Sequence, residues 1–129
     1  MATCPYCKKE ATLETGETIY PHRPDLYTLY FWACMKCKAW VGCHGTSQVP
    51  MGRLANAASR KLKSKAHSFF DPIWKTGYMT RTRAYAWLQG MTGLSADDCH
   101  MGMMDDEMLR KVAKMCRQFL LETGIRNDV

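Results

Sequence analysis

The chain has 129 residues, of which 47% are hydrophobic and 23% charged, and a formal net charge of +6. This length allows one domain or two very small ones, because a single hydrophobic core usually needs about 100 residues. The longest apolar-looking run, residues 26–41, is interrupted by Lys36 and Lys38, which excludes a membrane span of about 20 apolar residues.

Two Cys-x-x-Cys pairs, Cys4 with Cys7 and Cys34 with Cys37, stand in the first third of the chain. Each pair closes a tight turn that aims two thiolates at one point, and two such pairs complete the tetrahedron that zinc prefers. Free buried cysteines and an iron–sulfur cluster are the alternatives, but two separated pairs on strand turns favour a zinc ribbon. All four positions are sulfur, so we predict one structural Zn²⁺ with no open position for water.

Short strands are expected around this metal site. Residues 11–15 and 18–20 flank Gly16 as a possible hairpin, and residues 27–33 and 39–43 are aromatic and β-branched enough to be strands. Each cysteine pair would then lie on a turn at a strand end. The stretch from Gly45 to Gly52 is typical of a loop.

The apolar period changes to that of a helix from Leu54 to Phe70, with basic residues on the remaining faces. The Asp71-Pro72 dipeptide should end this helix, because a residue before proline is pushed out of the helical region.

Two further helices follow. One begins after Thr80, a plausible N-cap, and ends at Gly93, after which Ser95 is placed to cap a short turn. The last helix carries acidic residues at 105–107, where the helix dipole favours them, and stops at Gly124. The side chains expected in the helical core are Leu62, Phe69, Trp74, Trp87, Leu88, Leu109, Val112 and Phe119.

These elements predict a small α+β fold in which a four-cysteine zinc ribbon is followed by a helical C-terminal part. We place the ribbon at residues 1–50 and the helical region at residues 51–129. The helical region is expected to pack on the ribbon or to form one continuous domain with it.

The positive charge is concentrated between residues 53 and 83, where eight basic residues stand against Asp71 alone. Such a stretch beside a zinc module is typical of a surface that contacts nucleic-acid phosphates, although a solvated helix face has the same composition. The leading hypothesis is therefore a zinc-stabilised nucleic-acid-binding module, of DNA or RNA. The predicted phosphate contacts are Arg53, Arg60, Lys61, Lys63, Lys65, Arg81 and Arg83.

Aromatic residues of the ribbon have two interpretations. They can stack on unpaired bases, or they can cover the small core of the ribbon, and we favour the core for Trp32 and Trp40. The residues concerned are Tyr27, Tyr30, Phe31, Trp32 and Trp40.

His44, Asn56 and His67 occur in the order His-Asn-His after the zinc module, as in one class of one-metal nucleases. His44 would activate water while Asn56 and His67 hold a cation near a phosphate. That class places its asparagine in a loop before the helix, whereas Asn56 falls inside the predicted helix, where it shares a face with Arg60 and His67. Polar residues along a helix are the simpler interpretation.

Further cysteines and histidines offer weaker metal sites. Cys43 and His44 lie shortly after the second pair, and His44 or His22 would be a substitute ligand. Cys99, His100 and Cys116 have irregular spacing, so packing is the better interpretation for these three.

A protein partner is the first alternative to nucleic acid, and the His-Asn-His nuclease is the second. The contact with a protein partner would be a methionine-rich patch formed by Met101, Met103, Met104 and Met108. The chain opens with Met-Ala-Thr-Cys, so we expect no signal peptide. Paired cysteines indicate a reducing cytoplasm. The sequence does not predict the oligomeric state.

The chain resembles the zinc-finger-containing domain family found in bacteriophage and prophage genes. The segments that carry the resemblance are Cys4-Pro5-Tyr6-Cys7, Pro21-His22-Arg23, Phe31-Trp32, Cys34 with Cys37, Val41-Gly42-Cys43-His44, Gly52-Arg53-Leu54-Ala55-Asn56, Ala66-His67, Phe69, Asp71-Pro72, Trp74, Arg83-Ala84-Tyr85, Trp87-Leu88 and His100-Met101-Gly102. The resemblance implies a zinc-binding, phage-encoded protein that works inside a bacterial cell, without implying a reaction. The protein partner of the first alternative would then be a host protein. Lys8 and Lys38 follow the two cysteine pairs at positions where many zinc knuckles carry glycine.

Overall fold

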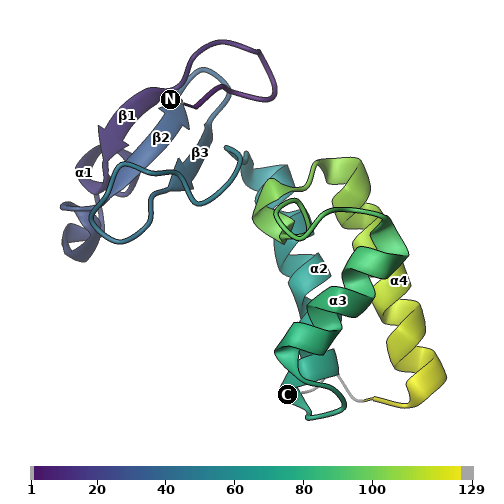
Figure 1. Ribbon diagram of the computed structural model, residues 1–129. Helices are drawn as coiled ribbons and strands as arrows, with labels where there is room; N and C mark the ends of the chain where they lie inside the picture. Colours follow the sequence, from purple (N-terminus) through teal and green to yellow (C-terminus); the bar gives the residue numbers. More distant parts are fainter. Residues whose placement is uncertain (1, 126–129) are drawn as a thin grey trace. The chain divides into compact units, whose positions relative to one another are not determined.

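The computed structural model describes residues 2–125, so the last four residues of the predicted helical region lie outside it. The chain divides into two compact units, residues 1–58 and 59–129. Figure 1 shows a small sheet in the first unit and long helices in the second. The predicted α+β fold, with four cysteines clustered near the N-terminus, is confirmed.

The sheet of the first unit contains three antiparallel strands in the order β1-β2-β3. These are β1 (Thr12–Thr15), β2 (Tyr30–Cys34) and β3 (Ala39–Gly42). Thr12 lies opposite Ala33 and Phe31 lies opposite Gly42. The second cysteine pair thus spans the turn between β2 and β3.

The predicted hairpin around Gly16 is wrong. Residues 16–19 form a short helix, α1 (Gly16–Ile19), followed by η1 (Pro24–Leu26), and β1 pairs with β2 instead. Gly16 is required for close approach, because a Cβ atom there would lie 1.9 Å from the Leu26 carbonyl oxygen. Its N–H donates to the Leu29 carbonyl at 3.0 Å. Glycine is therefore needed here because the backbone at Gly16 passes close to the backbone at Leu26, and not because a hairpin turns at this position.

The first long helix, α2 (Ala57–Lys75), is displaced at both ends from the predicted 54–70. Ala55 pairs with Trp40 of β3 through N–H···O bonds of 3.0 and 3.2 Å, and Leu54 is buried in the ribbon core. These contacts hold residues 54–55 in a bridge to the sheet. The sequence pattern gave no sign of this pairing.

The helix also continues through Pro72, contrary to prediction. A proline inside a helix costs about 3 kcal/mol. Phe70 and Ile73 on either side of it are fully buried in the second unit, and each contributes about 1.5–3 kcal/mol by leaving water. Burial of the two side chains thus offsets the proline.

The other two long helices begin and end close to their predicted positions. They are α3 (Arg81–Thr92) and α4 (Asp106–Thr123). The Thr80 and Asp105 side chains accept hydrogen bonds from the N–H groups of Arg83 and Met108, and Gly93 and Gly124 end the helices in the left-handed conformation. Ser95 accepts from the Asp98 N–H, as expected for the short turn.

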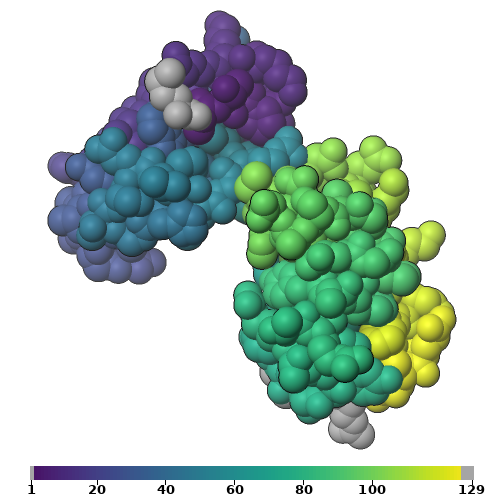
Figure 2. Space-filling view, viewed as in Figure 1, coloured from purple at the N-terminus to yellow at the C-terminus, as the bar shows by residue number. Residues whose placement is uncertain are grey.

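The core of the second unit contains Leu88, Leu109 and Val112 as predicted, whereas Leu62, Phe69, Trp74, Trp87 and Phe119 are partly buried against it. Short helix η2 (Met101–Met103) adds the buried Met101 to this core. In the space-filling view, α3 covers much of the visible face of this unit and α4 lies at its edge (Figure 2).

Candidate functional site

The first cysteine pair lies at the tip of a small loop closed by an antiparallel bridge between Thr3 and Glu10. The Cys4 N–H donates to the Lys9 carbonyl and the Lys8 N–H donates to the Cys4 carbonyl, both at 2.9 Å. Lys8 adopts a left-handed conformation with φ of 65°. The loop therefore turns back on itself immediately after Cys7, which brings both sulfurs to one side.

The second pair is held by the sheet. Cys34 is the last residue of β2, and the turn is closed by a 3.3 Å bond from the Lys38 N–H to the Met35 carbonyl. Lys38 also adopts a left-handed conformation, with φ of 52°. Both lysines thus take the conformation that favours glycine.

The four sulfur atoms of Cys4, Cys7, Cys34 and Cys37 all lie within 4.8 Å of one another. The Sγ atoms of Cys7 and Cys34 are 3.7 Å apart. A tetrahedral ion with metal–sulfur bonds of about 2.3 Å has sulfur–sulfur edges of about 3.8 Å. The four cysteines are free thiols, and their separation fits a four-coordinate metal ion.

The electrostatics of the cluster favour a cation. The Lys9 N–H lowers the pKa of the Cys7 thiol to about 7, while burial raises the pKa of the Cys37 thiol to about 12. Four thiolates this close repel one another, so they ionise together only when a positive ion compensates their charge.

Residues 1–119 match the family model described as a zinc-finger-containing domain. The chain belongs to this family. No curated protein and no solved structure matches the chain. The family description and the four-cysteine cluster together support a zinc-stabilised module, and these four cysteines could hold the metal ion.

A segment before α2 also packs against the zinc-finger cluster. Leu54 and Ala39 are buried around Cys4, and the Tyr6 hydroxyl accepts a 3.1 Å bond from the Asn56 N–H. Tyr6 stands between Cys4 and Cys7, so the metal-binding loop is directly connected to the residues that lead into α2.

The additional cysteines do not form part of this cluster. Within residues 2–125, the four cysteines named above are the one group of three or more His, Cys, Asp or Glu residues close enough to share a metal. Burial raises the pKa of the Cys43, Cys99 and Cys116 thiols, which is typical of structural cysteines. His22 and His44 are exposed.

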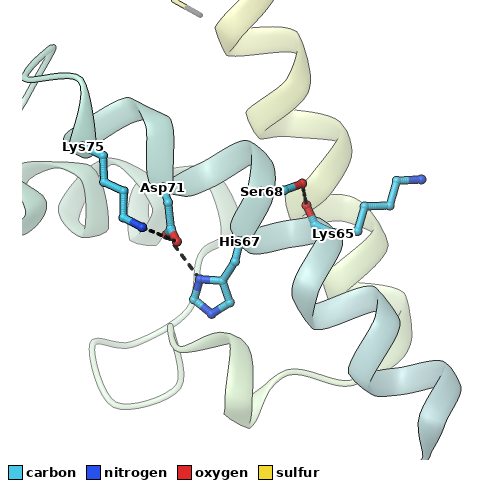
Figure 3. A network of polar contacts seen from close by, with 5 residues as sticks. All are labelled: Lys65, His67, Ser68, Asp71 and Lys75. Carbon is cyan, nitrogen blue, oxygen red and sulfur yellow. Dashed lines mark hydrogen bonds and ion pairs between the residues drawn. The ribbon is translucent and has the colours of Figure 1, made fainter. Parts of the chain in front are cut away.

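The three residues of the nuclease hypothesis occur in different settings. His44 lies on an exposed turn, and Asn56 precedes α2, which corrects its predicted place on that helix. His67 lies on α2 in the second unit, with its Nδ1 3.2 Å from the Asp71 carboxylate. Figure 3 shows this pair together with Lys75, whose Nζ is 3.9 Å from the same carboxylate.

The predicted phosphate contacts lie on several faces. In α2, Lys61 and Lys65 lie on one flank while Arg60 and Lys63 lie on the other, since residues four and three apart share a helix face. Arg53 belongs to the first unit. Arg83 is exposed.

Arg81 has an additional structural role. Its guanidinium lies 4.9 Å from the ring centroid of Tyr85 and 5.7 Å from that of Trp74. Such cation–π contacts help to pack α3 against α2.

Three exposed cations of α4, Arg110, Lys114 and Arg117, were missed by sequence reasoning. When charges are summed over the whole of α4, the acidic residues of its first turn offset most of the charge of these three cations. Their spacing of four and three residues is the signal that could have found them, because it puts all three on one helix face.

The ribbon aromatics serve mainly its packing. Phe31 is buried, the Trp40 indole N–H donates to the Tyr20 hydroxyl at 3.1 Å, and the Trp32 indole N–H donates to the Gln48 carbonyl at 2.7 Å. Trp32 and Trp40 are both partly buried against the ribbon clusters, in agreement with their predicted role in the core.

The predicted methionine patch is wrong for two of its members. Met101 and Met104 are 2% and 6% exposed and belong to the helical core. Met103 is exposed, and Met108 lines a shallow hollow with Met91 and Met115. A continuous patch of the four predicted methionines is therefore absent.

Proposed function

We propose that the protein is a nucleic-acid-binding module stabilised by one structural Zn²⁺ on Cys4, Cys7, Cys34 and Cys37. A site with four sulfur ligands leaves no open position for water, so the ion would hold the ribbon together and take no part in a reaction. No helix within residues 2–125 is long and apolar enough to cross a bilayer.

The observation that carries the proposal is a group of uncompensated cations on α2. Lys61, Lys63 and Lys65 form no ion pair with a carboxylate of the described residues. The one acidic residue of α2, Asp71, already contacts His67 and Lys75. The first half of the helix therefore has positive charge available for phosphates.

Lys63 supports the same conclusion. Its pKa is lowered, first by partial burial and then by the nearby Arg60 guanidinium. An ammonium group placed beside another cation is electrostatically unfavourable in the free protein. A bound polyanion would relieve the smaller part of this shift, which comes from Arg60.

The test is the salt dependence of binding. The zinc-loaded protein is titrated against labelled DNA and RNA oligonucleotides over a range of potassium chloride concentrations, with fluorescence anisotropy as the readout. We expect log affinity to fall linearly with log salt, by about 0.7–0.9 for each phosphate contacted. The triple variant Lys61→Glu, Lys63→Glu, Lys65→Glu should flatten this slope.

A matched control reverses three exposed lysines outside the first half of α2, Lys9, Lys75 and Lys111, and therefore changes the net charge equally. The proposal requires that the control keep a steeper slope than the α2 variant. Binding that ignores salt, or equal losses in both variants, would exclude specific phosphate contacts by the first half of α2.

A further inference from the structure

A groove runs between α2 and α4 in the second unit. It has a volume of about 220 Å³, with Leu62, Phe69 and Ala113 as its apolar floor. The cations that line it are Lys65, Arg110, Lys114 and Arg117. Near the start of α4, the buried Ser59 hydroxyl donates to the Asp106 carboxylate at 2.6 Å, which ties the two helices together.

The four cations of this groove have no carboxylate partner in the described part of the chain. Figure 3 shows the Lys65 side chain pointing away from Asp71. By contrast Lys111, which follows Arg110 on α4 but does not line the groove, lies 3.6 Å from Glu107. The groove thus concentrates positive charge that the protein itself does not neutralise, which favours an anionic occupant.

The spacing of the α4 cations fits one strand of nucleic acid. Seven residues of helix, from Arg110 to Arg117, rise about 10.5 Å. Successive phosphates of one strand are about 3.4 Å apart along a duplex axis and farther apart when an unpaired strand is extended. In both cases this length of α4 is enough to contact more than one phosphate of the same strand.

The apolar floor distinguishes this groove from a simple basic patch. Phe69 and Arg117 also line an adjoining hollow with Leu120, Leu121 and Ile125, so apolar surface continues along the same seam. Leu121 is 63% exposed. A duplex keeps the faces of its bases stacked inside, whereas an unpaired strand can turn the face of a base against an aromatic ring.

We propose that the α2–α4 groove binds a single unpaired nucleic-acid strand, with phosphates on Arg110, Lys114, Arg117 and Lys65 and a base against Phe69. This inference rests on the proposed function and deepens it. It moves the principal contact from the predicted set, which comprises Arg53 and residues of α2 and α3, to α4, and it names single-stranded nucleic acid as the partner.

The experiment compares labelled oligothymidylate with the duplex formed by annealing it to oligoadenylate, using the zinc-loaded full chain. We expect the single strand to bind more tightly at equal salt. The double variant Arg110→Glu, Arg117→Glu should reduce the salt slope by about 1.4, because each single-strand phosphate contact contributes about 0.7. The conservative variant Phe69→Leu should weaken single-strand binding about fivefold or more while leaving the duplex unaffected.

The matched control is the double reversal Lys75→Glu, Lys111→Glu, which makes the same charge change outside the groove. Its slope of log affinity against log salt should differ from that of the wild type by less than about 0.7, the contribution of one phosphate contact. Circular dichroism of each variant confirms that the helices are intact, so that a loss of binding reports on the groove.

The outcomes separate this inference from the proposed function. If the wild-type protein binds neither oligonucleotide, the proposed function fails and this inference falls with it. If it binds, but the Arg110 and Arg117 variant behaves as wild type or the duplex binds more tightly, the groove inference fails while nucleic-acid binding stands. Displacement by poly-L-glutamate as effective as by unlabelled oligothymidylate would instead assign the groove to an acidic protein segment.

Discussion

Lys8 and Lys38 carry a conformational cost at the two metal-binding turns. With φ of 65° and 52°, both hold an L-residue in the left-handed region. This region costs roughly 1–2 kcal/mol for a residue with a Cβ atom, whereas glycine enters it freely but loses about 0.5–1 kcal/mol in chain entropy on folding. We therefore expect Lys8→Gly and Lys38→Gly each to stabilise the zinc-loaded protein by about 0.5–1 kcal/mol, measured by denaturant unfolding.

Lys36→Gly is the matched control for this prediction. Lys36 lies in the same turn as Lys38 and is also exposed, but it does not have a positive φ. Glycine at this position should leave stability unchanged or lower it. A loss of stability in all three variants would show that the lysine side chains contribute more than the strain costs.

At this scale the sequence pointed to the four cysteines that the structure brings together, but not to the proposed groove cations Arg110 and Arg117. Two Cys-x-x-Cys pairs are self-contained signals, because each pair needs only a local turn to direct its sulfurs. The spacing of Arg110 and Arg117 indicates only that they share a helix face. Their proposed role depends on Leu62 and Phe69 of another helix lying beside them, which a one-dimensional charge count does not contain.

Among the elements, those with local end signals were predicted accurately. Thr80 and Gly93 bound α3, and Asp105 and Gly124 bound α4, because caps act within one turn of the residues they terminate. The start of α2 and the conformation of residues 16–19 were predicted wrongly, because both depend on partners distant in sequence. Ala55 pairs with Trp40, and Gly16 lies against Leu26.

The N-cap of α4 provides a test at the element scale. The Asp105 carboxylate accepts a 2.8 Å bond from the Met108 N–H and lies at the positive end of the helix dipole. Asp105→Ala should lower the free energy of unfolding of the helical unit by about 1 kcal/mol, which corresponds to a fall in Tm of about 4–8 °C. Thermal unfolding followed by far-ultraviolet circular dichroism measures this change.

Asp97→Ala serves as its control, because Asp97 is exposed and makes no hydrogen bond or ion pair with another described residue. Its Tm should stay close to that of the wild type. Equal shifts in the two variants would mean that general charge, and not the cap, accounts for the effect.

On the scale of the whole molecule, the two units differ in what stabilises them. The ribbon has two small clusters of buried residues, one around Cys4 and Leu54 and the other around Phe31. The helical unit has a much larger core that includes Phe70, Ile73 and Leu88. A ribbon of this size buries too little apolar surface to offset its chain entropy without a metal. The helical unit contains none of the four clustered cysteines, so its stability should depend on its apolar core.

Metal removal should therefore affect the units unequally. On chelation, ¹H–¹⁵N spectra should lose the dispersed signals of β1, β2 and β3 while those of α2, α3 and α4 persist, and the helical circular dichroism should remain largely unchanged.

Cys37→Ser should reproduce this state without chelator, since it removes one of the four sulfurs. Cys43→Ser should keep the metal, because Cys43 is buried outside the cluster. Collapse of the helical signals together with the ribbon would show instead that the metal supports both units, and retention of the ribbon signals would mean that its stability does not depend on the ion.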